Sequence, residues 1–186
     1  MSRQYSQITP YRHLRLLTLL SLAAGLLPAD GRAQSSDRDG WQRVPDVIAA
    51  LDIGGGSQVA DVGAGNGYFT THLARQVGAS GAVFAVEIGE SELSRLRRLA
   101  EDEDLENIQV VHGEIDDPRL PEESLDGVLV VDAYHEMTEY EQMLAGMRRA
   151  LRPGGRLVII DLAPNDGSAS RDRQTDSHRI SIELVE

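Results

Sequence analysis

The chain has 186 residues, 41% of them hydrophobic and 26% charged, which fits one globular domain and argues against a disordered or fibrous protein. Its formal net charge of −12 disfavours a nucleic-acid partner, because an acidic surface repels phosphate groups. The absence of cysteine and lysine excludes a thiol nucleophile, a disulfide scaffold, a zinc–thiolate site and Schiff-base chemistry on lysine.

Residues 1–33 have the pattern of a secretory signal peptide. Arg3, Arg12 and Arg15 supply positive charge, an apolar run covers 14–27, and small residues precede a cleavage site after Ala33. The apolar run is shorter than the roughly 20 residues that span a bilayer. We therefore predict a signal peptide or leader, export to the periplasm and no membrane span after its removal. A cytoplasmic location is the alternative.

The rest of the chain is predicted as a polar linker over 34–40 and one domain over 41–186. Hydrophobic residues at helical spacing predict a first helix over 44–51, which the three glycines from Gly54 end. Apolar strands and amphipathic helices then alternate. Strands are expected at 58–62, 82–87, 108–112, 125–131 and 156–161, and helices at 69–77, 93–100 and 140–151. Thr138 and Glu141 predict a capping box for the last of these helices.

Strands that are apolar nearly throughout, separated by amphipathic helices, indicate a sheet covered on both faces. We therefore predict an α/β fold with a doubly wound, mainly parallel sheet. Ligands of such sheets bind outside the carboxyl ends of the strands.

The first strand end is followed by the glycine turn Gly63-Ala64-Gly65-Asn66-Gly67, and Asp61 precedes it. Glycines let a ligand approach the backbone closely. The spacing is G-x-G-x-G, which differs from the G-x-G-x-x-G of dinucleotide-binding proteins and counts against a nicotinamide oxidoreductase. An acidic residue beside the turn suits a cationic ligand better than a diphosphate.

The next two strands also end in acidic residues. Glu87 can accept both hydroxyls of a ribose, and Glu114 with Ile115 can hold an adenine by its amino group and its face. Taken alone, Glu87 is equally consistent with a solvated strand end, and the residues from Asp116 to Pro118 with an ordinary turn.

As a set, these segments resemble the class I S-adenosylmethionine-dependent methyltransferase family. The resemblance rests on VADVGAGNGYFT at 59–70, Glu87, Gly113-Glu114, LDGVLVVDAYHEM at 125–137 and LRPGGRLVIID at 151–161. The leader, together with DDPRLP and VDAYHEM, is similar to a group of bacterial methyltransferases of unassigned substrate that have export-like leaders.

The resemblance implies a Rossmann-like methyltransferase fold, S-adenosylmethionine as cofactor, and a binding site for it. The implied cofactor-binding residues are Asp61, Gly63, Gly65, Gly67, Tyr68, Glu87, Glu114, Ile115 and Asp132. Asp61 would lie near the methionine amino group and Glu87 would hold the ribose. The three glycines would let the backbone pass under the cofactor, and Asp132 would face the methionine moiety or the substrate.

His135, just after the fourth strand, is the candidate general base, and Asp132 or Glu136 is expected to orient it. The alternative is that His135 caps the next helix or lines the pocket without proton transfer. Asp132, His135 and Glu136 are also possible metal ligands, but mixed ligands on one turn are weak evidence, and we predict no metal. Trp41 either walls the pocket or packs, and His178 lies in a last helical stretch near the substrate pocket or on the surface.

These features predict a methyltransferase that acts on a small-molecule acceptor. A non-catalytic domain that binds S-adenosylmethionine or S-adenosylhomocysteine is the alternative. The family fold continues after the fifth strand with a helix and an antiparallel strand pair. The sequence ends at Glu186, so we expect that strand pair to be missing.

Overall fold

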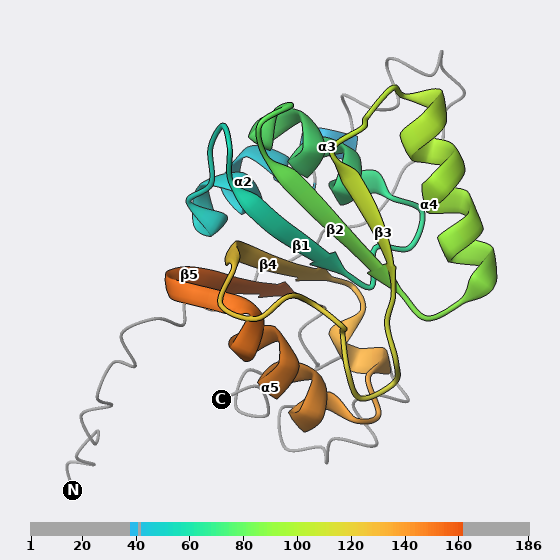
Figure 1. The fold of residues 1–186 in the computed structure, drawn as a ribbon, viewed down its shortest axis with the longest axis vertical. Helices are drawn as coiled ribbons and strands as arrows, with labels where there is room; N and C mark the ends of the chain where they lie inside the picture. Colours follow the sequence, from blue (N-terminus) through green and yellow to red (C-terminus); the bar gives the residue numbers. More distant parts are fainter. Residues whose placement is uncertain (1–37, 41, 162–186) are drawn as a thin grey trace, which may run out of the picture.

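A computed structural model describes residues 38–40 and 42–161, which contain a five-stranded parallel sheet (Figure 1). The strands are β1 Gln58–Val62, β2 Ala82–Glu87, β3 Ile108–His112, β4 Leu125–Val131 and β5 Leu151–Ile160. Their order is β3-β2-β1-β4-β5, and every neighbouring pair is parallel. The chain leaves β1 toward β2 and later returns to its other side as β4. The predicted doubly wound sheet is confirmed.

In the described part of the chain, one α-helix precedes β1, and three further α-helices and one short 3₁₀ helix lie between strands. Their bounds are α2 Val44–Leu51, α3 Tyr68–Val77, α4 Glu90–Asp102, η1 Tyr134–Glu136 and α5 Tyr140–Ala150. Figure 1 shows α2 and α3 on one side of the sheet and α5 on the other. Residues that alternate along each strand face opposite layers, so both faces of the sheet are buried under helices.

The two helical layers cover two separate hydrophobic clusters. Val59 of β1 packs in the cluster formed with α2 and α3, whereas its neighbour Ala60 packs in the cluster that contains Met143 and Met147 of α5. Leu96 of α4 packs against Ala85, on the face of the sheet that α2 and α3 cover. This double burial explains why the strands are apolar at consecutive positions.

Two details of the last helix and strand differ from the prediction. The helix α5 begins at Tyr140 after Glu139 and has no side-chain cap, so the predicted capping box of Thr138 is wrong. Leu151, expected on the helix, instead begins β5 by pairing with Leu125. A shift of register follows before Arg156 pairs with Gly127, because the turn around Pro153 is accommodated within the strand.

Several predictions fall outside the described residues. These are the signal peptide, Trp41, His178 with its helical stretch, and the expected loss of the C-terminal strand pair. Residues 38–40, which lie in the predicted linker, form a helical turn. Within the described ranges, no helix has the length and hydropathy that a membrane span requires.

Candidate functional site

A cavity of about 610 Å³ lies at the carboxyl ends of the central strands. Its walls are the loop after β1, the ends of β2 and β3, the loop after β4, and Arg38 and Gln42 from the beginning of the described chain. The cavity is at the switch point where the chain runs to opposite sides of β1, the position at which open α/β sheets bind ligands.

The glycine turn after β1 forms the floor of this cavity. Gly63 adopts a φ of 74°, and a Cβ atom at this position would lie 2.5 Å from the Cβ of Ala133 in the loop after β4. Gly65 has a φ of 56°, lines the cavity, and has open space where a side chain would begin. The first glycine therefore lets two loops meet, and the second leaves room for a ligand.

Gly67 is placed differently from the other two glycines of the turn. It is not among the residues that line the cavity, and a Cβ atom there would overlap the side chain of Leu99 and come within 3.0 Å of Leu96. Gly67 therefore allows the beginning of α3 to pack closely against α4. The expectation that its backbone passes under the cofactor stays a prediction.

Replacement of Gly63 by alanine is expected to weaken cofactor binding more than it weakens folding. Gly154→Ala is the matched control, because Gly154 also has a positive φ, of 90°, but lies exposed in β5 with open space at its Cβ position. Both variants should lose about 1 kcal/mol of unfolding free energy from backbone strain. Only the first displaces the loop after β4, so calorimetric titration should show weaker S-adenosylhomocysteine binding for that variant alone. Equal binding by both variants would contradict this role of Gly63.

Glu87 closes the cavity from the end of β2. One of its carboxylate oxygens accepts a hydrogen bond from the backbone N–H of Gly65 at 2.7 Å, and the other from the N–H of Ile88 at 3.2 Å. The carboxylate is thereby held between the glycine turn and the next loop, and Glu87 is part of the cavity wall. This is the position predicted for the group that accepts the ribose hydroxyls.

Asp61 is a buried carboxyl group at the end of β1. It is 2% exposed and accepts a hydrogen bond of 2.6 Å from the hydroxyl of Thr70 on α3. Burial, with a smaller contribution from the charge of Glu87, raises the pKa of Asp61 to about 6. An ionised Asp61 costs folding free energy, which a cationic ligand in the cavity would offset.

Replacement of Asp61 by asparagine is expected to stabilise the fold at neutral pH, because Asn can still accept the hydrogen bond from Thr70. The pKa of Asp61 is higher in the folded than in the unfolded chain, so its ionisation opposes folding increasingly between pH about 4 and 6. The gain in unfolding free energy should be larger at pH 8 than at pH 5 by about 1 kcal/mol. Urea unfolding of both proteins at the two pH values measures it, and a gain that does not change with pH would contradict the assignment.

The loop after β3 contributes Glu114 and Ile115 to the cavity wall. The Glu114 carboxylate forms an ion pair with Arg119, and the Glu114 backbone N–H donates to the carbonyl of Asp117 at 2.7 Å. Ile115 and Ile88 are 57% and 56% exposed, the large hydrophobic side chains left open in the described structure. Both line the cavity, where they offer apolar faces for a planar ring.

The loop after β4 begins with Asp132, which has a φ of 55°, a region that residues other than glycine rarely adopt. Asp132 lines the cavity together with Ala133, Glu136 and Met137. Partial desolvation and then the charge of Asp161 raise the pKa of Asp132. Strained backbone and a perturbed carboxyl at a cavity wall are common features of functional sites.

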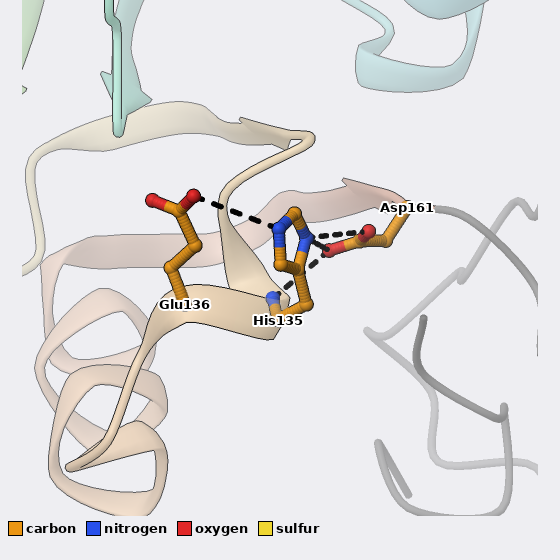
Figure 2. Close-up of polar contacts among 3 residues, drawn as sticks. All are labelled: His135, Glu136 and Asp161. Atoms are coloured by element: carbon orange, nitrogen blue, oxygen red, sulfur yellow. Dashed lines mark hydrogen bonds and ion pairs between the residues drawn. The ribbon is translucent and has the colours of Figure 1, made fainter. Parts of the chain in front are cut away.

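His135 is buried and is held by Asp161, the residue that follows β5 (Figure 2). The Nδ1 atom of His135 lies 2.9 and 3.1 Å from the two carboxylate oxygens of Asp161, and the backbone N–H of His135 donates to the same carboxylate at 3.0 Å. Figure 2 shows the Nε2 atom on the opposite side of the ring, 3.7 Å from Glu136. Asp161 thus has the orienting role that we predicted for Asp132 or Glu136.

The predicted site residues therefore divide into two groups. The cavity wall contains Asp61, Gly63, Gly65, Tyr68, Glu87, Glu114, Ile115 and Asp132. Among the described residues, His135 and Gly67 are not part of that wall. Asp161 was missed as a partner of His135, although its position at the end of an apolar strand was a signal that the sequence offered.

Asp132, His135 and Asp161 each offer a ligand atom within 4.8 Å of the others, a spacing that a metal ion would also accept. Glu136, which the sequence suggested as the third member of such a group, does not belong to it. The hydrogen bonds between Asp161 and His135 already use both carboxylate oxygens. This geometry favours an oriented imidazole.

The amino-acid sequence that forms this cavity matches a known protein family. Residues 59–155 match the model of a family described as a methyltransferase domain. A demethylmenaquinone methyltransferase of Listeria welshimeri is 29% identical over 126 residues, which are 67% of this chain and 52% of that protein. A ubiquinone/menaquinone biosynthesis C-methyltransferase of Hahella chejuensis is 32% identical over 124 residues, 66% of this chain and 49% of that protein.

The fold is also similar to solved structures of methyltransferases. The crystal structure of a SAM-dependent methyltransferase from Aquifex aeolicus superimposes with a TM-score of 0.63 and 23% sequence identity, covering 76% of this chain and 78% of that one. This likeness shows a shared fold. The chain spans about half the length of the curated relatives it matches.

Proposed function

Since this chain belongs to the methyltransferase-domain family, we propose that it transfers a methyl group from S-adenosylmethionine to a small-molecule acceptor. The observation that supports this most directly is Glu87, a residue of the cavity wall whose carboxylate is held by the backbone N–H groups of Gly65 and Ile88. Such a carboxylate accepts the two hydroxyls of a ribose.

The described residues fit S-adenosylmethionine, the cofactor of this family. When bound, this cofactor supplies an electrophilic methyl group on a positively charged sulfur. Carboxylates line the cavity, and they suit the sulfonium and ammonium charges of the cofactor; they are Asp61, Glu87, Glu92, Glu114, Asp132 and Glu136. Ile88 and Ile115 provide apolar surface for the adenine.

The cavity wall also contains apolar side chains from the loop after β4 and from α5. Ala133 and Met137 from the loop after β4 and Met143 from α5 form this part of the wall. Methionine side chains adapt to flat apolar ligands. Together with the quinone methyltransferases among the relatives, this wall supports a ring-containing acceptor such as a demethylmenaquinol.

His135 is not part of the described cavity wall, but Glu136 lines the cavity and its carboxylate lies 3.7 Å from Nε2 of His135. His135 is therefore proposed to accept, by way of Glu136, the proton that such an acceptor loses when it gains the methyl group. The carboxylate of Asp161 accepts a hydrogen bond from Nδ1–H of His135, so the lone pair of the imidazole is on Nε2. The acceptor would gain the methyl group and give up a proton, and S-adenosylmethionine would supply the methyl group and leave as the uncharged thioether S-adenosylhomocysteine. Holding the ring in one tautomer and orientation is the contribution of Asp161.

Two measurements on the full chain test this function. Calorimetric titration with S-adenosylmethionine and S-adenosylhomocysteine should give binding in the micromolar range. Incubation with radiolabelled cofactor and a panel of reduced quinones, phenols and carboxylic acids should give a labelled, extractable product. Binding without transfer to any acceptor would support the non-catalytic binding domain instead, and absence of binding by the folded chain would overturn both functions.

A further inference from the structure

We propose that Arg38 binds the carboxylate of the methionine moiety of the cofactor. This inference rests on the proposed function, because it concerns how the cavity recognises S-adenosylmethionine. The sequence suggested no partner for that carboxylate, and the segment that contains Arg38 was expected to be a linker. The structure instead places Arg38 in the cavity wall.

The charges of the cavity point to this role. The cofactor has two cationic groups, the sulfonium and the ammonium, and one anionic group, the carboxylate. Six carboxylate side chains line the cavity and repel that anion. Among the described lining residues, Arg38 is the one cationic side chain, so the anion of the cofactor has one favourable place to bind.

The position of the Arg38 side chain is determined by Tyr68, the first residue of α3. The guanidinium carbon of Arg38 lies 3.8 Å from the centre of the Tyr68 ring, and the two groups form a cation–π contact. Tyr68 follows the glycine turn directly, on the side of the cavity where Asp61 is held by Thr70 of the same helix. Asp61, Tyr68 and Arg38 all line the cavity, and Asp61 is the residue that the resemblance places near the methionine moiety.

The segment that contains Arg38 is attached to α3 through Asp39. The Asp39 carboxylate accepts a hydrogen bond of 2.5 Å from the Tyr68 hydroxyl and lies 3.2 Å from Nε2 of His72. Burial and the contact with Asp39 raise the pKa of Tyr68, which keeps the hydroxyl protonated as the donor. These contacts anchor the helical turn at 38–40 against the glycine-turn side of the cavity.

The Arg38 side chain has an N–H group that is free to bind a ligand. Its Nε atom is buried and has no hydrogen-bond partner among the described residues. A buried N–H without an acceptor is unfavourable, and a ligand carboxylate would satisfy it. Arg presents parallel N–H groups that match the two oxygens of a carboxylate, a geometry that lysine lacks.

The test compares two ligands that differ only in the carboxylate: S-adenosylhomocysteine and its decarboxylated analogue, the corresponding thiopropylamine. Arg38→Ala in the full chain should raise the Kd for S-adenosylhomocysteine by roughly 10–100-fold and leave the Kd for the decarboxylated analogue unchanged. Arg43→Ala is the control, because Arg43 is an exposed neighbouring cation that pairs with Asp46 and does not line the cavity. It should change neither Kd.

Each outcome decides the question. Arg38→Lys should restore part of the preference for the carboxylate-bearing ligand, which shows that the charge acts and that the variant is folded. An equal loss of affinity for both ligands in Arg38→Ala would assign Arg38 a purely structural role and overturn the inference. If the wild-type chain binds the decarboxylated analogue as tightly as S-adenosylhomocysteine, the inference fails while the nucleoside site stands. If it binds neither ligand, the proposed function itself fails.

Discussion

Replacement of Glu87 by glutamine is expected to raise the Kd for S-adenosylmethionine and S-adenosylhomocysteine by about 10–100-fold, which corresponds to about 1.4–2.8 kcal/mol. The fold should survive, because the glutamine side-chain oxygen can still accept the hydrogen bond from the N–H of Gly65. The amide nitrogen, however, cannot accept a hydrogen bond. One ribose hydroxyl then loses its acceptor, and the remaining hydrogen bond loses its charge assistance.

The matched control for this prediction is Glu92→Gln. Glu92 also lines the cavity, and its substitution removes the same unit of charge, but its carboxylate accepts a hydrogen bond from the neighbouring Ser91 hydroxyl. Calorimetry with 2′-deoxy-S-adenosylhomocysteine adds a second control, since its affinity should fall less in the Glu87 variant than that of the parent ligand. Equal effects of the two substitutions would mean that Glu87 acts through general electrostatics, and an unchanged Kd would remove its ribose role.

Replacement of His135 by asparagine is expected to lower the rate of methyl transfer by about 100-fold or more, with little change in the Kd for S-adenosylhomocysteine. His135 is buried and is not part of the described cavity wall, so cofactor binding should not depend on it. Single-turnover methyl transfer, with an acceptor from the panel, measures the rate. A variant that retains the wild-type rate would show that His135 accepts no proton.

The substitution Asp161→Asn separates the effect of Asp161 on the orientation of the His135 ring from its effect on the stability of the fold. The asparagine side chain retains an acceptor for the backbone N–H of His135, but its amide no longer requires the proton to be on Nδ1 of the imidazole. We expect a lower kcat at unchanged KM and, in ¹⁵N NMR of labelled histidine, a change of tautomer at His135. An unaltered tautomer with reduced kcat would show that Asp161 acts in another way.

Much of the fold and much of the cavity wall follow from local patterns along the chain. The bounds of the first four strands agree with the prediction because apolar runs between glycine turns are a local property, and the carboxyl ends of parallel strands meet at one edge. Glu87 and the turn around Gly65 could be assigned in advance for the same reason. The alternation of strand and helix predicts a doubly wound sheet but not the order of its strands, because such sheets occur with more than one order.

The remaining contacts join segments that no local pattern relates. Asp161 is 26 residues from His135, and the two meet because β5 pairs with β4 in the register that brings Val131 beside Ile160. Arg38 enters the cavity because a turn that reads as a linker docks on Tyr68. The raised pKa of Asp61 depends on how completely α3 covers the end of β1. Hydrophobic periodicity specifies which elements form and which faces they bury, whereas partners and charge states depend on distances between elements, which only packing sets.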